Sequence, residues 1–188
     1  MKNIRLRKMI LSSVFCVLIA ACSWISFPFP VTGIPITLQT LAIFLCLIVC
    51  GGKWGCASIG LYIIIGMIGV PVFSGFKGGI GVLAGPTGGY IIGFIFTGLL
   101  YMICEMVFKN LKLPVKIIVL FSGLLLCYTF GTVWFTLVYS KNTGNIGFGT
   151  AITYCVLPYI IPDIIKLGVA VSLSIPLNKL KDKIIDTK

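Results

Sequence analysis

Long, continuous apolar runs separated by short segments rich in glycine and proline dominate the chain. A helix needs about 20 predominantly apolar residues to cross a bilayer, and runs of this kind are typical of membrane spans. The pattern predicts helices over residues 9–27, 36–50, 54–70, 90–108, 115–139 and 162–181. We therefore expect an all-α integral membrane protein with six transmembrane helices, in which residues 1–188 form a single domain.

The composition supports this class. Of the 188 residues, 59% are hydrophobic and only 10% are charged, which is too little charge to cover the surface of a water-soluble domain. The net charge of +11 would be compatible with a nucleic-acid partner, but the basic residues lie at the ends of the apolar runs. No basic face is interleaved with aromatic residues, so no nucleic-acid partner is expected.

The basic residues predict the orientation in the membrane. In the six-helix arrangement, twelve of the fifteen fall on the side of the two termini, whereas only Lys77 and Lys141 fall on the opposite side. The twelve are Lys2, Arg5, Arg7, Lys8, Lys53, Lys109, Lys112, Lys116, Lys179, Lys181, Lys183 and Lys188. Positively charged loops face the cytoplasm, so both termini are expected there, and the segments 27–37, 71–89 and 140–162 are expected outside.

The first apolar run is followed by more membrane segments rather than by a polar domain, so we expect it to be a retained helix and not a cleaved signal peptide. Ser12, Cys16 and Ala20 recur at intervals of four and form one stripe of small residues. Such a stripe lets another helix approach closely within lipid. Spacing alone leaves open whether that helix belongs to a partner or to this chain.

The candidate site is the pair Asp163 and Lys166, which lies in an apolar sequence. A spacing of three puts both side chains on one face of a helix. A charge in hydrocarbon costs from about 2.5 to well over 10 kcal/mol, so the pair should face a cavity, a partner or a ligand. Because proline favours the first helical position, Pro162 predicts the helix start and puts Asp163 in the outer first turn. The alternative is a structural ion pair within the helix.

The two charges suggest a kind of ligand. A carboxylate that accepts and an ammonium that donates would complement a planar group with N–H donors and a carbonyl, such as an amide, urea or lactam. The glycine-rich segment 71–89 and the aromatic residues Phe73, Tyr90 and Trp134 could enclose an apolar remainder. As an alternative, the segment 71–89 is only a flexible connector.

Several kinds of chemistry are excluded by what the sequence lacks. It has no histidine, so nucleophile–histidine catalysis is not available, and no phosphate-binding loop for nucleotide hydrolysis. The eight cysteines lie in or beside apolar runs without a CxxC pair, which favours small buried hydrophobes over metal ligands. We therefore expect a binding or transport protein rather than an enzyme, with no catalytic residues, no metal and no cofactor.

Five motifs occur in order along nearly the whole chain, within residues 12–181. They are Pro35–Thr40 (PITLQT), Tyr62–Phe73, Gly85–Tyr90 (GPTGGY), Gly131–Trp134 (GTVW) and Pro158–Lys166. Together they are highly specific, and with them the chain resembles the BioY family, the biotin-binding S components of energy-coupling factor (ECF) transporters.

The resemblance implies a multi-pass protein of the bacterial plasma membrane with the six-helix S-component fold and a biotin pocket near the outer face. It implies a transmembrane coupling subunit and two cytoplasmic ATPase subunits as partners. By motif position it implies that Asp163 and Lys166 bind the ureido ring, and it assigns further ligand-binding residues: Gln39, Tyr90, Thr37, Phe73 and Gly79.

The resemblance also implies that the small-residue stripe of the first helix docks the coupling subunit. Ser12 and Cys16 stand there in place of alanines, while Ala20 is retained. Pro162 stands where the family commonly has glycine. Two alternatives to a biotin S component remain: an S component for another vitamin, or a small oligomeric membrane channel. A channel would favour a polar stripe repeated on several helices, and the sequence has none.

Overall fold

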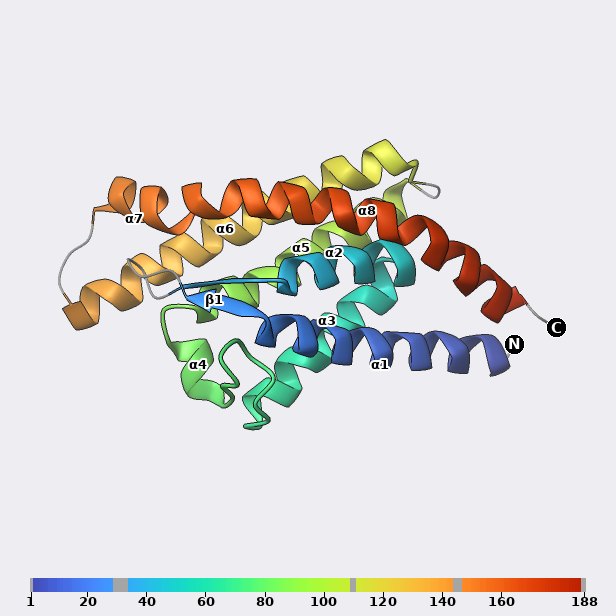
Figure 1. Ribbon diagram of the computed structural model, residues 1–188, viewed down its shortest axis with the longest axis horizontal. Coiled ribbons are helices and arrows are strands. Elements are labelled where there is room, and N and C mark those ends of the chain that lie inside the picture. The colour runs from blue at the N-terminus through green and yellow to red at the C-terminus, as the bar shows by residue number, and fades with distance from the viewer. Residues whose placement is uncertain (1, 29–33, 109–110, 144–146, 187–188) are drawn as a thin grey trace.

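The computed structural model describes residues 2–28, 34–108, 111–143 and 147–186. The fold is an elongated helical bundle in which both termini lie at the same end (Figure 1). The helices are α1 (Lys2–Trp24), α2 (Gln39–Cys50), α3 (Gly52–Met67), α4 (Ile80–Ala84), α5 (Gly88–Val107), α6 (Leu113–Thr143), α7 (Phe148–Cys155) and α8 (Leu157–Asp186). Two short strands, β1 (Ser26–Pro28) and β2 (Pro35–Thr37), pair in antiparallel fashion between α1 and α2.

Four helical segments in the described part are long and apolar enough to cross a membrane. They are Ile4–Trp24, Gly88–Val107, Leu113–Ser140 and Phe148–Lys181. The helices α2 and α3 have 12 and 16 residues, so they are about 18 and 24 Å long, less than the roughly 30 Å of a hydrocarbon core. The protein is therefore a multi-pass membrane protein, while the count of six crossings remains a prediction.

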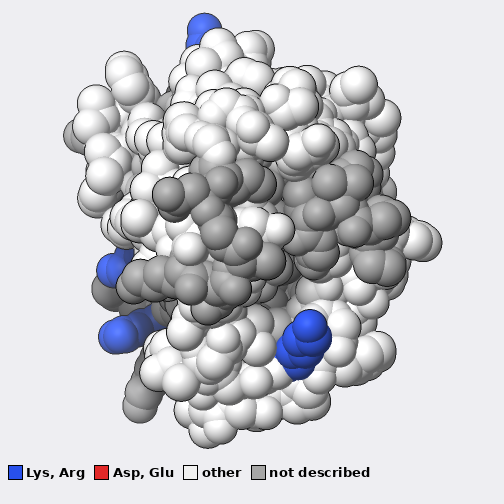
Figure 2. All heavy atoms as spheres, turned by 90° about the vertical axis from the view of Figure 1, so that its left-hand side faces the viewer, with Lys and Arg blue, Asp and Glu red and all other residues white. Residues whose placement is uncertain are grey.

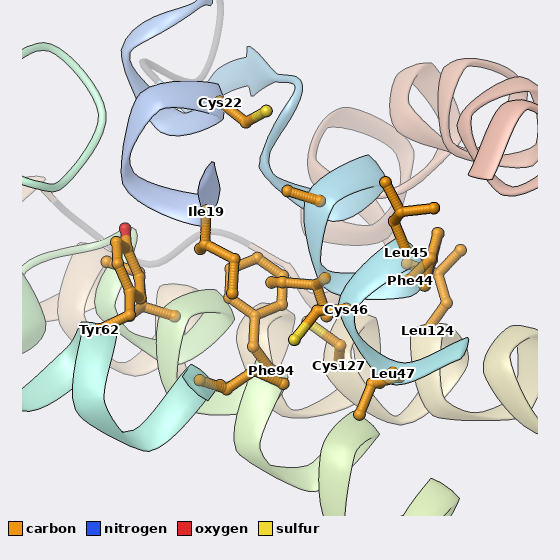
Figure 3. Packing of buried hydrophobic residues seen from close by; sticks show 14 of the residues in the cluster. Ile19, Cys22, Phe44, Leu45, Cys46, Leu47, Tyr62, Phe94, Leu124 and Cys127 are labelled. Atoms are coloured by element: carbon orange, nitrogen blue, oxygen red, sulfur yellow. The ribbon is translucent and has the colours of Figure 1, made fainter. Parts of the chain in front are cut away.

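The core lies where α1, α2, α5 and α6 converge. Figure 3 shows Ile19 of α1, Cys46 of α2 and Phe94 of α5 side by side in this packing. Helices α5 and α6 can approach closely because Gly89 and Gly93 of α5 have no Cβ. A Cβ at Gly89 would overlap Trp134, and one at Gly93 would overlap Cys127. Five of the eight cysteines are buried and three are half-buried, and all are free thiols, which confirms their interpretation as small hydrophobic residues.

The small-residue stripe of α1 packs inside the molecule. Ser12, Cys16 and Ala20 are all buried, and the Ser12 hydroxyl lies 2.8 Å from that of Ser58 in α3 and 3.1 Å from the carbonyl oxygen of Trp54. In the isolated chain, the stripe is thus covered in part by α3. This contact agrees with intramolecular packing, one of the two alternatives, while docking of the coupling subunit on the stripe stays a prediction.

The start of the last helix differs from the prediction. Helix α8 begins at Leu157 rather than Pro162, and Pro162 lies inside it. The helix begins there because α7 ends at Val156. The carbonyl of Val156 then accepts hydrogen bonds from the N–H groups of Tyr159 and Ile160, which start the new helix. Pro158 then occupies the first turn, where the lack of an N–H costs nothing. Asp163 consequently lies in the second turn of α8 and not in the first.

The predicted irregular segments contain more regular structure than expected. Part of the segment 27–37 forms the β1–β2 ladder, while residues 29–33 lie outside the described part. Within 71–89, the Phe73 N–H donates to the Lys77 carbonyl at 2.9 Å, and positive φ angles at Gly75 and Phe76 close this turn. The short helices α4 and α7 follow in the second and third segments, so the glycine-rich segment is a folded structure rather than a plain connector.

The two ends of the bundle carry very different amounts of charge. The end formed by β1, α4 and α7 shows few lysine or arginine atoms and no acidic ones among the residues drawn (Figure 2). At the other end, beside the termini, lysines of four helices lie around one cavity: Lys8, Lys53, Lys116 and Lys181. The fold thus gathers at one end four of the twelve basic residues that were predicted to lie on one side.

Candidate ligand-binding site

Asp163 and Lys166 form a buried ion pair on the inner face of α8. The Nζ of Lys166 lies 2.7 Å from Oδ1 of Asp163, and the two residues are 9% and 4% exposed. The neighbouring residue Ile161 is 70% exposed on the opposite side of the same helix. The helix therefore presents apolar residues outward and both charges inward, as the spacing of three predicted.

Two further helices contribute donors to the carboxylate. The Thr40 hydroxyl of α2 donates to Oδ1 at 2.8 Å, and the Tyr128 hydroxyl of α6 donates to Oδ2 at 2.5 Å. A carboxylate has about four lone-pair sites, so Asp163 can accept one more hydrogen bond beyond those from Lys166, Thr40 and Tyr128. Lys166 has three N–H groups and donates one of them to Asp163. The pair is satisfied and can still bind both a donor and an acceptor.

One cavity adjoins this pair, and a second cavity adjoins the first. A cavity of about 70 Å³, here called the small compartment, is lined by Asp163, Lys166 and Tyr128. A cavity of about 340 Å³, the large compartment, is lined by residues of β2, α2, α5 and the turn at Phe73–Lys77. The compartments share lining residues: Ile34, Pro35, Thr37, Tyr90 and Phe94. They are two parts of one site, whose combined size falls within the range of about 300–1,000 Å³ of small-molecule pockets.

Four other residues expected at the site lie in it. Thr37 and Tyr90 line both compartments, while Gln39 and Phe73 line the large one. The Tyr90 hydroxyl lies 3.1 Å from the Thr132 hydroxyl, and the Gln39 amide donates to the Tyr62 hydroxyl at 3.0 Å. These bonds hold the polar groups in fixed orientations along the wall.

Two expected residues lie elsewhere. Gly79 lines neither compartment; its φ angle of +94° and its N–H bond to the Gly66 carbonyl at 2.7 Å shape the turn before α4. The Trp134 indole donates to the Gly85 carbonyl at 3.0 Å, and its ring lines a different cavity, between α4, α5 and α6. Gly79 and Trp134 therefore support the structure around the site without bordering it.

Several residues that border the site were not predicted from the sequence. Thr40 and Tyr128 bind the Asp163 carboxylate, Tyr159 donates to the Ile34 carbonyl at 2.6 Å, and Lys77 lines the large compartment. A signal existed for Tyr128, because it and Thr132 are polar residues four apart in an apolar helix and so share one face. Thr40 was part of the PITLQT motif, but nothing local indicated that it would meet Asp163.

The fold and the cavity define a class: a multi-pass membrane protein with a buried, charged ligand site. The BioY family model matches residues 1–183. The chain is 34% identical over 176 residues to the biotin transporter BioY of Thermotoga maritima, covering 94% of this chain and 98% of that protein. It is 38% identical over 138 residues to a probable biotin transporter BioY of Pyrococcus horikoshii, covering 73% and 76%.

Among solved structures, the fold matches the crystal structure of an S component for biotin from an ECF-type ABC transporter. The TM-score is 0.83 with 25% sequence identity, and the match covers 95% of this chain and 94% of that one. The chain belongs to the BioY family and has the S-component fold. It is a binding and transport subunit rather than an enzyme.

Proposed function

We propose that this chain is the high-affinity biotin-binding S component of an ECF transporter. The observation that carries the proposal is the buried Asp163–Lys166 pair at one end of a cavity with two compartments. The names of the relatives and of the matching structure support biotin as the ligand. Biotin contains a cyclic urea with two N–H groups and one carbonyl, which is the combination that this pair can bind.

We expect the ureido ring of biotin to bind beside Asp163 and Lys166. The remaining acceptor site on Asp163 would take one urea N–H, and a free N–H of Lys166 would donate to the urea carbonyl. Hydrogen bonds to charged groups contribute about 1.5–3 kcal/mol each, more than neutral ones. Because the small compartment is narrow, ligand entry requires its side chains to adjust around the ring.

The rest of biotin is apolar except for a carboxylate at the end of its chain. Phe73, Tyr90 and Phe94 offer apolar walls in the large compartment. Lys77, which lies in the turn that closes this compartment, offers a positive charge for the carboxylate. The two lysines would thus bind the two polar ends of one ligand.

The test is a titration of the detergent-purified chain with biotin by calorimetry, followed by a thermal-shift screen of other water-soluble vitamins. We expect saturable binding of one biotin per chain and no comparable stabilisation by vitamins without a cyclic urea. Preferential binding of a vitamin without a urea would instead support an S component for that vitamin. Absence of binding by a folded sample would overturn the proposal.

We also propose the partners that the family resemblance implies: a transmembrane coupling subunit and two cytoplasmic ATPases. The sequence has no phosphate-binding loop, so the energy for uptake would come from the partners. The purified chain should show no ATP hydrolysis, and co-expression with an ECF module should produce ATP-dependent biotin uptake. ATPase activity in the isolated chain would contradict this part of the proposal.

We further propose six crossings in the bacterial plasma membrane with both termini in the cytoplasm. The lysines that lie together at the end with the termini support this orientation. Helices α2 and α3 would be the two shortest crossings, and residues next to them in the chain would have to span the rest of the membrane. A C-terminal fusion to green fluorescent protein should fluoresce, whereas a C-terminal alkaline phosphatase fusion should be inactive. The opposite pair of results would reverse the orientation.

A further inference from the structure

A second cavity lies at the end of the bundle opposite the proposed biotin site. It has a volume of about 350 Å³ and lies beside the two termini. Segments far apart in the sequence line it: Lys8 of α1, Lys53 of α3, Glu105 of α5, Lys116 of α6 and Lys181 of α8. Its size is that of a small-molecule pocket, and its lining is dominated by positive charge.

The one carboxylate in this lining is already engaged. Oε2 of Glu105 accepts the backbone N–H of Gly52 at 2.6 Å, at the first residue of α3. An anion at a helix N-terminus is stabilised by the helix dipole, so this charge serves α3. Four lysines therefore share the cavity with one carboxylate, which already accepts the Gly52 N–H. The cavity has a surplus of positive charge.

At least one of the lysines is held in place by the fold. The Nζ of Lys181 donates to the Val49 carbonyl at 3.1 Å, in the last turn of α2, and to the side chain of Asn178 at 3.2 Å. The backbone carbonyls at a helix C-terminus attract a cation. This lysine is thus oriented toward the cavity wall by neighbouring helices rather than extended freely into solvent.

The cavity also lies where the spans predict the lipid headgroups to be. Its lysines are near the ends of three apolar segments, Ile4–Trp24, Leu113–Ser140 and Phe148–Lys181. Trp54, a residue type enriched at membrane–water interfaces, is part of the lining. Basic pockets between transmembrane helices at this depth are typical binding sites for anionic lipid headgroups.

We propose that this cavity, formed around Lys8, Lys53, Lys116 and Lys181, binds the phosphate headgroup of an anionic phospholipid. The lysine ammonium groups supply the charge for the phosphate oxygens, and the acyl chains extend along the apolar surface of the adjacent helices. The site is independent of biotin, because its residues and those of the biotin cavity do not overlap.

The proposal is tested by native mass spectrometry of the delipidated, detergent-purified full chain titrated with phosphatidylglycerol or phosphatidylcholine. Phosphatidylglycerol should bind more tightly, and K53Q and K116Q should each weaken its binding about fivefold, as expected for the loss of one lysine near a membrane surface. Lys112→Gln is the matched control: Lys112 is exposed on the same end but does not line the cavity, so its loss should have little effect.

Three results would overturn the proposal. The first is equal binding of the two lipids. The second is an equal loss of affinity in Lys112→Gln and Lys53→Gln, which would indicate general surface charge rather than a cavity. The third is competition by inorganic phosphate at the same concentrations as phosphatidylglycerol, which would identify a soluble phosphate as the ligand. Unchanged melting temperature and biotin binding in the variants show that they are folded.

Discussion

Among the side chains that the structure describes, two groupings of carboxylate and lysine differ in depth and in balance. Asp163 and Lys166 are buried, match one to one, and receive further donors from two other helices. Glu105 is half-buried beside four lysines and accepts a backbone N–H instead. The first grouping is complete without a ligand, whereas the second keeps a surplus of charge.

This difference indicates what each end can recognise. The buried pair keeps one acceptor site and further N–H groups for a neutral ligand that offers both donors and acceptors. A surplus of lysines, of which Lys53 is exposed and the other three are half-buried, favours an anion and gives little selectivity beyond charge. Breaking a buried pair typically costs about 3–5 kcal/mol, against about 0–1 kcal/mol for an exposed one. The same kind of substitution should therefore have very different effects at the two ends.

The largest effect is expected from Asp163→Asn. An amide has the same shape but removes the charge opposite Lys166 and turns one acceptor into a donor facing Tyr128. We expect biotin affinity to fall by about a hundredfold or more, because one or two charged hydrogen bonds are lost. Calorimetry measures the affinity, and a melting curve shows whether the variant is folded. A folded variant with unchanged affinity would falsify the proposed role of Asp163.

The second largest effect is expected where Gly66 of α3 packs against Phe73, which lines the large compartment. A Cβ at Gly66 would overlap the ring of Phe73, which is fully buried against Tyr62, whereas a Cβ at Gly60 in the same helix meets no atom. Gly66→Ala should destabilise the protein by about 1–3 kcal/mol through overpacking. Gly60→Ala should be neutral or stabilising, since alanine favours helices.

Thermal unfolding in detergent compares these two variants directly. Gly66→Ala should also weaken biotin binding, since Phe73 lines the large compartment, and Gly60→Ala should not. If the two variants melt at the same temperature, Phe73 can move to make room for the added methyl group. The biotin cavity would then be less rigid than proposed, and the contrast with the charged end would be weaker.

How far the sequence predicts this fold depends on the range of the interactions involved. The apolar runs predict the long helices well, because length and hydrophobicity are local properties. The same runs do not reveal which face of a helix turns inward, and so spacing alone did not show that Ser12 meets Ser58 of this chain. The predicted start of α8 was wrong because both Pro158 and Pro162 suit the first turn of a helix. The end of α7 at Val156 places Pro158 there, and the sequence does not show this end.

The candidate site was predictable in part for the same reason. The Asp163–Lys166 pair is a local pattern, and its burial follows from the cost of isolated charge in an apolar segment. The donors Thr40 and Tyr128 lie 123 and 35 positions away from Asp163 in sequence. No spacing rule connects residues at such distances, so these contacts emerge only from the packing of α2, α6 and α8.

A smaller effect is expected from Lys77→Gln. Lys77 is exposed at the large compartment, so its attraction to the biotin carboxylate is screened by solvent and salt. We expect biotin affinity to fall about threefold to fivefold at low salt and less at high salt. Biotin methyl ester, which lacks the charge, should bind the variant and the unchanged chain equally. A similar loss for the ester would mean that Lys77 acts through the shape of the turn.

The smallest effect is expected from Glu105→Gln, the counterpart of Asp163→Asn at the other end. The glutamine carbonyl can still accept the Gly52 N–H, so only the charge at the N-terminus of α3 is lost. Such a charge contributes about 0.5 kcal/mol at a partly exposed helix end. We expect a slightly lower melting temperature and unchanged biotin affinity, measured by the same calorimetry.

The pair of variants tests the contrast between the ends directly, since each replaces one carboxylate by its amide. If Glu105→Gln reduced biotin affinity as strongly as Asp163→Asn does, the two ends would be coupled through α3 and α5 rather than independent. If it destabilised the protein by several kcal/mol, the charge of Glu105 would be reducing the repulsion among the four lysines as well as capping α3. The carboxylate would then offset one of the four positive charges, and the other three would still favour an external anion.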